Sequence, residues 1–328
     1  MNNLNLVTGA NGHLGNNLVR ALLARGDAQQ VRASVRNPNN RAPFEGLDCE
    51  IVQADLLDKN SLLRAMEGVD TLYQVAAVFK HWARDPQKEI VGPNLQGTRN
   101  VLEAAAEQRV RRVVYVSSEV TLDDRVSSVD ESTWRSEFHG NPYVQSKTES
   151  ERLAWQLAGE LGLDMVSVLP GAIIGPHCFR LTPTMHYLQQ ALTGEVFVDV
   201  NFYFTFVDVR DVAEGMVAAA QKGQRGERYL LATKDPVSTQ QIIALAREIN
   251  PKVKKPRRAP KFLLQIMSSA MELAGKITGK QPLLLRSQVE LFYGVAPRKD
   301  ISKARTELGF NPRPPETAVR EALAYLAN

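Results

Sequence analysis

Three glycines between an apolar run and an amphipathic stretch place the strongest constraint on the fold. Residues 4–8 have the composition of a short buried strand, and the residues from His13 onward have the period of an amphipathic helix. The turn between them carries Gly9, Gly12 and Gly15, so the backbone can turn tightly and approach a pyrophosphate at the helix N-terminus. Glycine is the ordinary residue of any tight turn, and the spacing is G-x-x-G-x-x-G rather than G-x-G-x-x-G. Its place between a strand and a helix nevertheless predicts a dinucleotide-binding loop.

Strand-like and helix-like segments alternate along the first half of the chain. Further runs with strand composition lie at residues 31–35, 50–54, 71–75, 113–117 and 165–169, and helical patterns separate them. Helical connections between such strands imply right-handed crossovers. The alternation therefore predicts an α/β fold, a doubly wound parallel sheet of the Rossmann type.

The alternation stops after Pro170. Residues 171–203 are rich in proline, glycine and aromatic residues, whereas residues 204–223 return to a strand followed by a helix. Residues 224–328 have helical patterns around a basic stretch marked by prolines. We therefore predict a dinucleotide-binding domain made of residues 1–170 plus 204–223. Residues 171–203 plus 224–328 form the predicted substrate lobe, which is smaller, discontinuous and C-terminal.

Composition indicates an ordinary globular enzyme. The 328 residues carry a formal charge of +4 and a pI near 9.0, which is too mild to indicate nucleic-acid binding. Cys49 and Cys178 have neither a pairing pattern nor a metal-ligand spacing, so we expect reduced thiols and no metal site. No charged leader with an apolar run and no bilayer-length apolar run occurs, which predicts a cytoplasmic protein without stable membrane insertion.

Tyr143 and Lys147 lie four residues apart in a stretch with a helical pattern, so they share one face of the expected helix. An ammonium near a phenol favours the phenolate and lowers the pKa of the tyrosine toward neutrality. Such a tyrosine can exchange a proton with a carbinol oxygen, and a serine hydroxyl such as that of Ser118 can hold the same oxygen. Because Y-x-x-x-K pairs also occur on ordinary solvated helices, this interpretation depends on the dinucleotide loop.

The residue that follows the second strand indicates which nucleotide binds. An acid there accepts from the ribose 2′-hydroxyl and repels a 2′-phosphate, but this chain has Arg36, whose guanidinium suits a phosphate. We predict NADP(H) rather than NAD(H); the alternative is a surface arginine in an enzyme that takes either cofactor. Asp55 follows the third strand, where its carboxylate can accept from the adenine amino group. Capping the next helix, which begins near Asp58, is the other role open to it.

Taken together, these motifs resemble those of the short-chain dehydrogenase/reductases in their extended branch. The likeness runs over nearly the whole chain. The loop at residues 8–15 looks like the nucleotide loop of that branch, and Tyr143-x-x-x-Lys147 like its active-site pair. Residues 75–77, 94–98 and 170–176 resemble the end of its fourth strand, a helix motif and the segment that meets the nicotinamide.

Two groups within the superfamily share further residues with this chain. Residues 31–38 are similar to the dihydroflavonol reductase-like proteins, which use NADPH. Residues 82–86 and 182–184 are similar to the hopanoid-associated sugar epimerase group.

The resemblance implies a role for each site residue. Ser118 would position the carbonyl, and Tyr143 would be the acid/base. Lys147 would hold the ribose and tune the tyrosine, with support from Asn94 through water. The residues implied to bind the cofactor are Thr8, Gly9, Asn11, Gly12, His13, Leu14, Gly15, Arg36, Asp55, Leu56, Val75, Ala76, Ala77, Tyr143, Lys147, Pro170, Gly171, Ala172 and Ile173.

Two residues depart from the family pattern. Glu119 follows Ser118 where reductases usually carry a small residue. Sugar-nucleotide dehydratases have an acid there, but they pair it with a second acid at the next position, which is Val120 here, so a dehydratase is disfavoured. Arg210 stands where the family often has an acid, and the sequence offers no account of that change.

We expect an NADPH-dependent carbonyl reductase that acts on a ketone or aldehyde of an apolar or aromatic small molecule. A sugar-nucleotide epimerase would use the same groups and is the alternative, whereas an NADP sensor would typically lack the Tyr–Lys pair. Residues 194–204 are acidic and aromatic, which is a poor lining for a diphosphate. Phe79, His81 and Trp82, after the fourth strand, also favour an apolar substrate.

A basic run from Lys252 to Lys261 precedes a stretch with apolar residues at helical spacing: Phe262, Leu263, Ile266, Met267 and Met271. A solvated loop and core packing would account for both features. Weak association of residues 252–273 with a membrane surface is a further interpretation, as is attraction of diphosphates to the cleft. The family resemblance also implies a homodimer formed through helices that flank the sheet.

Overall fold

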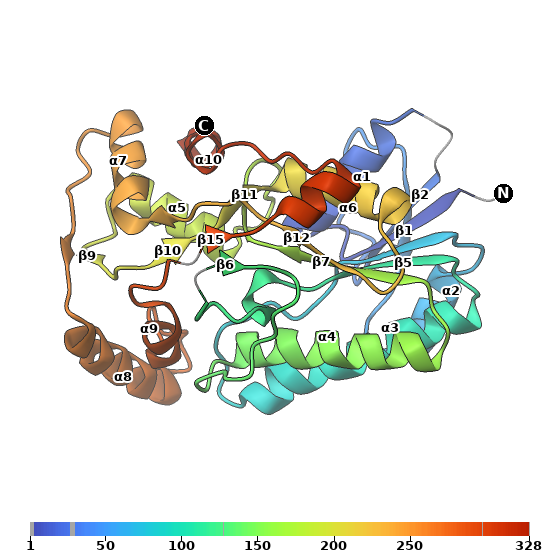
Figure 1. Cartoon of the computed structure of the whole chain (residues 1–328), viewed down its shortest axis with the longest axis horizontal. Helices are drawn as coiled ribbons and strands as arrows, with labels where there is room; N and C mark the ends of the chain where they lie inside the picture. Colours follow the sequence, from blue (N-terminus) through green and yellow to red (C-terminus); the bar gives the residue numbers. More distant parts are fainter. Residues whose placement is uncertain (1–2, 27–29, 127, 297, 328) are drawn as a thin grey trace.

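A parallel sheet of seven strands lies at the centre of the computed structural model, which describes residues 3–26, 30–126, 128–296 and 298–327 (Figure 1). The strands are arranged in the order β12-β7-β5-β4-β1-β2-β3. Their bounds are β1 Leu4–Thr8, β2 Gln30–Val35, β3 Glu50–Gln53, β4 Thr71–Gln74, β5 Arg112–Val116, β7 Met165–Pro170 and β12 Arg228–Leu231. The predicted doubly wound α/β fold is confirmed.

Helices cover both faces of this sheet. On one face, α1 (His13–Leu23) packs against α6 (Val209–Lys222). On the other face lie α2 (Lys59–Ala65), α3 (Gly92–Glu107) and α4 (Pro142–Glu160) (Figure 1). Each layer has its own apolar core, because strands buried on both faces present side chains in both directions.

The order of the strands reverses beside β1. From β1 the chain continues to β2 and β3 on one side, and the later strands β4, β5, β7 and β12 extend the sheet on the other side. Ligands of open α/β sheets bind where this reversal occurs, outside the carboxyl ends of the strands. The ends of β1 and β4 therefore mark the expected binding crevice.

The rest of the chain forms a smaller part built from separate segments. The short strands β8 (Ala172–Ile174) and β11 (Phe206–Asp208) pair in parallel beyond the end of β7. The helices α5 (Pro183–Thr193), α7 (Thr239–Ile249) and α10 (Pro315–Ala327) share one apolar cluster.

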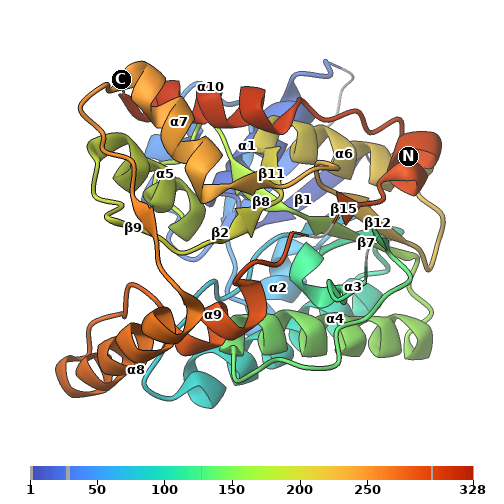
Figure 2. The same ribbon diagram turned by 60° about the vertical axis from the view of Figure 1, so that its left-hand side comes forward.

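The helices α8 (Lys261–Thr278) and α9 (Arg286–Phe292) pack together in a separate group (Figure 2). The remaining short strands are β6 Ser128–Val129, β9 Val198–Asp199, β10 Tyr203–Phe204, β13 Val237–Ser238, β14 Arg257–Arg258 and β15 Arg298–Lys299. Short helical turns occur at η1 Ala42–Phe44, η2 Gln87–Val91, η3 Glu119–Thr121 and η4 Ala304–Leu308.

One sequence expectation was wrong in this region. The predicted substrate lobe included residues 224–328, but residues 228–231 form β12, which pairs with β7 at the edge of the central sheet. Residues 171–203, where the strand–helix alternation stops in the sequence, contain α5, whose N-terminus is capped by Thr182. The signal was present, since a threonine followed by proline is typical of a helix start.

None of the helices within the described ranges combines the length and apolar character that crossing a bilayer requires.

Candidate active site

The glycine loop joins β1 to α1 at the reversal point of the sheet. Gly9 has a φ of +62°, and a Cβ there would lie 3.0 Å from the Cα of Ala76. A Cβ on Gly15 would overlap the carbonyl oxygen of Gly9, so both positions need glycine. Gly12 occupies the N-cap of α1, and its lack of a side chain leaves the first N–H groups of the helix uncapped. This cradle fits a pyrophosphate.

Thr8 ties the loop to the end of β4. Its Oγ1 accepts from the backbone N–H groups of Val75 and Ala76 at 2.9 and 3.0 Å, and donates to Gln74 Oε1 at 2.8 Å. The structure thus brings residues 75–77 beside the glycine loop, as the sequence motifs predicted. Sequence analysis missed Gln74, because a polar residue at a strand end carries no motif of its own.

His13 begins α1, but its imidazole turns away from the loop into the protein. Nε2 lies 3.1 Å from the carbonyl oxygen of Gly175 and 3.0 Å from that of Pro176. Carbonyl oxygens only accept, so Nε2 carries the proton. Burial lowers the pKa of His13 and favours the neutral ring. The side chain therefore ties α1 to the segment after β8, while Leu14 is buried in the core and Asn11 is exposed.

Arg36 and Asp55 lie at the ends of β2 and β3, on the same edge of the sheet as the loop. Arg36 is exposed, and no salt bridge joins its guanidinium to an acid within the described residues. Asp55 accepts from the N–H of Leu57 at 2.9 Å. The helix that follows is capped instead by Asp58, which accepts from the N–H groups at residues 60 and 61. The capping role considered for Asp55 was therefore wrong.

Tyr143 lies in the first turn of α4, with its phenol directed at Ser118. Asn141 caps the helix by accepting from the N–H groups of Tyr143 and Val144, both at 3.1 Å. The phenol donates to Ser118 Oγ at 3.4 Å. One helix turn later, Lys147 donates from Nζ to the carbonyl oxygen of Val116 at 3.3 Å. The structure thus brings together Ser118, Tyr143 and Lys147, which the sequence analysis placed in one site.

Burial dominates the pKa values of this group. It raises the pKa of Tyr143 to about 12, although the hydrogen bond with Ser118 works in the other direction. It lowers the pKa of Lys147 to about 8, against the attraction of the carboxylate of Glu151. In this structure, burial therefore shifts the pKa of Tyr143 upward, in the direction opposite to the one expected from a neighbouring lysine.

Asn94 connects α3 to both the loop after β4 and helix α4. Its Oδ1 accepts from the N–H of Val78 at 2.7 Å, while Nδ2 donates to the carbonyl of Val78 at 3.0 Å and to Ser146 Oγ at 2.7 Å. Its hydrogen bond to α4 thus goes to Ser146, the neighbour of Lys147. Sequence analysis missed Ser146, since serine in a helix has many surface roles.

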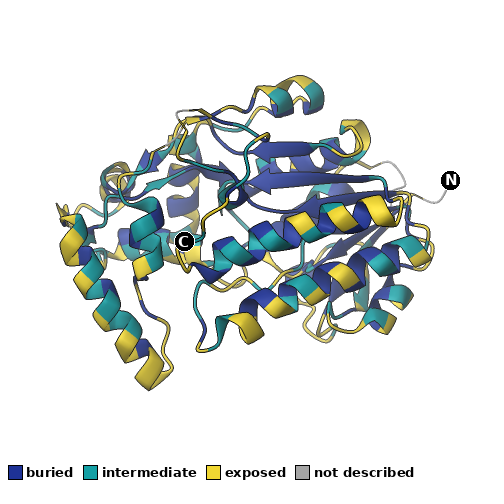
Figure 3. Ribbon diagram, turned by 60° about the horizontal axis from the view of Figure 1, so that its bottom comes forward, coloured by how far each residue is buried: buried dark blue, intermediate teal, exposed yellow. Residues whose placement is uncertain are grey.

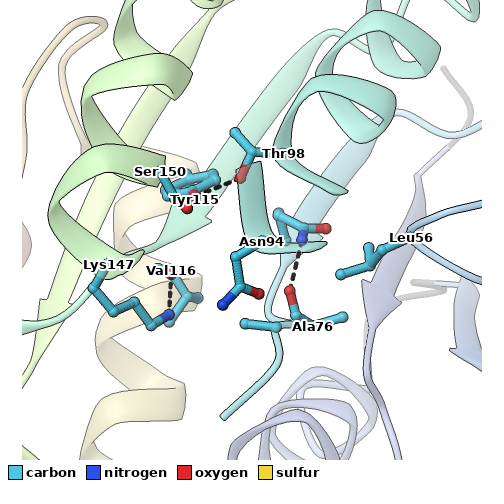
Figure 4. Close-up of a pocket in the computed structure, with 10 residues that line it drawn as sticks. Leu56, Ala76, Asn94, Thr98, Tyr115, Val116, Lys147 and Ser150 are labelled. Atoms are coloured by element: carbon cyan, nitrogen blue, oxygen red, sulfur yellow. Dashed lines mark hydrogen bonds between the residues drawn. The ribbon is translucent and has the colours of Figure 1, made fainter. Parts of the chain in front are cut away.

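Asn94 and Lys147 line one hollow. Figure 4 shows Lys147 and Leu56 on opposite sides of it, with Asn94 between them in this view. Its lining residues are Leu56, Gln74, Ala76, Ala77, Asn94, Thr98, Tyr115, Val116, Lys147 and Ser150. The hollow joins the end of β4 to the face of α4 that carries Lys147, which is where the predicted adenine-side and ribose-side residues converge.

The ring of Tyr143 is flanked by two aromatic side chains from the segment after β4. Its centroid lies 5.1 Å from that of Phe79 and 4.6 Å from that of His81. Burial lowers the pKa of His81 to about 4, so the imidazole is neutral at pH 7. Phe79 keeps 42% of its surface exposed beside the phenol. An aromatic wall therefore borders the ring of Tyr143.

A buried ion pair joins α4 to the central sheet, and sequence analysis missed it. Glu151 follows Lys147 by one turn and is fully buried. Its carboxylate accepts from Arg228 on β12, from Ser117 Oγ at 2.6 Å and from Ser167 Oγ at 2.8 Å. The four-residue spacing of positions 143, 147 and 151 was the signal that could have found it.

The segment after β7 returns toward the loop. The N–H of Gly171 donates to Leu231 at 3.1 Å, and that of Ala172 donates to the carbonyl of Thr205 at 2.8 Å. A Cβ on Gly171 would overlap that same carbonyl oxygen, so glycine is needed there. Pro170 ends β7, and Ile173 lies in β8, half-buried. These residues stand at the carboxyl end of β7, the edge at which the glycine loop also lies.

The two departures from the family pattern have structural partners. Glu119 is surrounded by protein, which raises its pKa, and Lys299 Nζ on β15 lies 3.4 Å from its Oε2. Arg210 pairs with Asp208 at 2.6 Å and with Glu321 on α10. Both residues therefore join the C-terminal segments to the rest of the molecule.

Comparisons with known proteins agree with this geometry. Residues 5–232 match the family described as NAD dependent epimerase/dehydratase family. Sterol demethylase protein B of Methylococcus capsulatus is 34% identical over 98% of this chain and 97% of its own length. A putative dihydroflavonol 4-reductase of Synechocystis sp. is 33% identical over 97% of this chain and 92% of its own length. The solved structure of gox2253 is 30% identical, covers 99% of this chain and 98% of its own, and superposes with a TM-score of 0.84.

The family match spans most of the chain, and the resemblance to the extended short-chain dehydrogenase/reductases is confirmed. The chain therefore belongs to the NAD dependent epimerase/dehydratase family, whose NAD(P)-dependent members act on CH–OH and C=O groups.

Proposed function

We propose that this protein is an NADPH-dependent carbonyl reductase that acts on an apolar or aromatic ketone or aldehyde. The observation that carries the proposal is the hydrogen bond of 3.4 Å between Tyr143 and Ser118, with the ammonium of Lys147 one helix turn after Tyr143. A substrate oxygen placed between the two hydroxyls would accept from both of them. The same oxygen would then receive the proton that reduction requires.

The proposed cofactor site follows the edge of the sheet. The N-terminus of α1, with Gly9, Gly12 and Gly15, would hold the pyrophosphate, because its first N–H groups are uncapped and the glycines allow the tight loop that leads to them. Asp55 would meet the adenine, and the exposed guanidinium of Arg36 would bind the 2′-phosphate of NADPH. Arg36 is the reason for proposing NADPH over NADH.

When bound, NADPH supplies the hydride that reduces the carbonyl carbon. Tyr143 gives its phenolic proton to the carbonyl oxygen, so the products are an alcohol and NADP⁺. Ser118 orients that oxygen, and Lys147 holds the nicotinamide ribose while its charge stabilises the phenolate that remains. The raised pKa of Tyr143 keeps its proton in place at neutral pH, which is the state that reduction needs. Oxidation, the first step of an epimerase, would need the phenolate instead.

The substrate class is proposed from the surroundings of Tyr143. Phe79 and a neutral His81 flank its ring, and such side chains favour an apolar ligand over a diphosphate. Asp199 brings no free charge to the lobe, because it is buried and paired with Arg258 at 3.1 Å. The names of the two relatives, which refer to a sterol and a dihydroflavonol, point to the same class of molecule.

The test follows NADPH absorbance with purified protein and a panel of polycyclic, aromatic and aliphatic ketones and aldehydes, with Tyr143→Phe as the blank. We expect NADPH consumption that depends on Tyr143 and is fastest with the polycyclic or aromatic compounds. Interconversion of UDP-glucose and UDP-galactose without net cofactor turnover would show an epimerase and overturn the proposal. Equal rates for the protein and its blank would overturn the role of Tyr143.

A further inference from the structure

Helix α8 has two apolar faces, and the outer one faces solvent. Its most exposed large side chains are Phe262, Ile266, Leu273 and Ile277, which keep 63%, 63%, 62% and 74% of their surfaces exposed. They are spaced four, seven and four residues apart, so they align on one side of the helix. Figure 3 shows exposed residues along the length of this helix, at the lower left.

The inner face of α8 accounts for its packing in the fold. Leu264 is buried, and it joins Phe202, Leu284 and Val289 in an apolar cluster, against which Met271 also packs. The outer residues contribute to no apolar cluster among the described residues. Solvent-exposed isoleucine, leucine and phenylalanine in one row mark a surface that binds something apolar.

A basic segment leads into α8. Between Glu248 and Glu272 the sequence has no acid but six cations: Lys252, Lys254, Lys255, Arg257, Arg258 and Lys261. Salt bridges engage Arg258, with Asp199, and Lys261, with Glu290; none joins the other four to an acid in the parts of the chain described. Exposed Lys276, Lys280 and Arg286 add charge at the other end of the helix. In Figure 1 the basic segment runs along one end of the molecule, from α7 to α8.

We propose that the outer face of α8 and the cations beside it dock the enzyme on an anionic lipid bilayer. An amphipathic helix lies in the interface with its apolar side chains among the acyl chains, while neighbouring lysines and arginines meet the headgroups. Both chemical requirements are present on one continuous stretch, residues 252–280. The proposal concerns binding to the surface of a bilayer and not insertion across it.

Charge argues for a bilayer over a second copy of this chain. A two-fold contact through α8 would place the same patch on both sides of the interface. The cations of residues 252–261 on one copy would then add to those on the other, and like charges repel. An anionic bilayer supplies the opposite charge.

Helix α9 connects the docking helix to the N-terminal end of α4. Asn141, which caps α4 two residues before Tyr143, lies 3.4 Å from Ser287 Oγ at the start of α9, and α9 packs against the inner face of α8. The outer face of α8 is therefore free of these contacts, and the docking does not depend on which reaction the site performs.

The experiment measures co-sedimentation of the full-length protein with vesicles of equimolar phosphatidylglycerol and phosphatidylcholine, and with vesicles of phosphatidylcholine alone. We expect binding to the anionic vesicles that weakens as salt rises. Ile266→Ser with Ile277→Ser should reduce the partition coefficient by about tenfold or more, and so should Lys254→Glu with Lys255→Glu. These residues are exposed, so the variants should keep the thermal unfolding temperature of the parent protein.

Matched controls change the same chemistry elsewhere. Leu161→Ser removes a partly exposed leucine at the far end of α4, and Arg64→Glu with Arg225→Glu reverses two exposed charges distant from α8. Both controls should bind vesicles as the parent does. Absence of binding by the parent protein would overturn the proposal, as would equal binding by the α8 variants. A dimer in sedimentation velocity that Ile266→Ser with Ile277→Ser dissolves would show that a second copy covers this face instead.

Discussion

Glu151 and Arg228 form an ion pair inside the protein, with Oε1 of the glutamate 3.0 Å from Nε of the arginine. The pair joins α4 to the edge strand β12, one helix turn after Lys147. Because Arg228 also donates to Thr121 and to backbone carbonyls at residues 131 and 133, it fixes several segments at once.

Glu151→Gln should destabilise the protein strongly, because it leaves the guanidinium of Arg228 buried without a counterion. The expected loss in the free energy of unfolding is about 3–5 kcal/mol, measured by urea denaturation. Glu248→Gln is the control, since its partner Arg320 is exposed and such pairs contribute less than about 1 kcal/mol. Losses of similar size in the two variants would contradict the role given to the buried pair.

Tyr143→Phe should lower kcat by about 10²–10⁴-fold, since the variant lacks the phenolic proton. The Kd for NADPH should stay within about threefold, because the aromatic ring remains in place. Tyr187→Phe serves as the control; that phenol hydrogen-bonds Thr239, at 3.3 Å, rather than Ser118. A Tyr143→Phe variant with the parent's kcat would remove the proton-donor role.

Arg36→Glu should weaken the affinity for NADPH by about 10–100-fold, because a carboxylate repels the 2′-phosphate that the guanidinium would bind. NADH should bind as before or better. Fluorescence titration with both nucleotides measures the ratio. Arg41→Glu changes the charge of another exposed arginine nearby and should leave the ratio unchanged. An unaltered NADPH/NADH ratio in Arg36→Glu would show that another residue selects the cofactor.

Gly15→Ala should weaken the affinities for NADPH and NADH alike, which distinguishes this variant from Arg36→Glu. The added Cβ would overlap the Gly9 carbonyl and lie 2.9 Å from the Cα of Ala10, so the loop must move. We expect a stability loss of about 1–3 kcal/mol as well. Gly159→Ala in α4, where a Cβ would meet nothing within 4 Å, should be neutral or stabilising.

Lys147→Met should raise the unfolding temperature at pH 7, by about 2 °C or more. The pKa of Lys147 is about 8 in the folded protein against 10.5 for an unperturbed lysine, so charging it costs stability below pH 8. Between these two values the unfolded chain binds one more proton than the folded chain, and the parent's stability rises with pH. The advantage of the variant should therefore shrink from pH 8 upward. An advantage that grows over this range would contradict the lowered pKa.

The sequence predicted the parts of the fold and site that follow from local pattern. The glycine loop, the strand–helix alternation and the Tyr143–Lys147 spacing are local features, and the structure contains each of them. The partnership of Tyr143 with Ser118 was also predicted, although 25 residues separate them. That prediction came from a family likeness, since spacing alone does not fix a contact between a helix and a loop.

Long-range partners could not be predicted in this way. The contacts of His13 with Gly175, of Glu119 with Lys299 and of Glu151 with Arg228 join residues far apart in the sequence, and nothing local encodes them. The rise in the pKa of Tyr143 depends on how much protein surrounds the phenol, which only packing determines. The place of β12 was missed for the same reason, because a strand of four residues does not by itself indicate which sheet it joins.

The position of β12 limits how this enzyme can be re-engineered. The chain leaves the central sheet after β7, builds part of the outer region, returns through α6 and β12, and leaves again. A chimera that transplants everything beyond residue 170 from a relative would also replace the edge strand and the arginine that neutralises Glu151. Transfer of substrate specificity from a relative therefore requires two separate replaced segments that leave residues 204–232 unchanged, so that the central sheet stays intact.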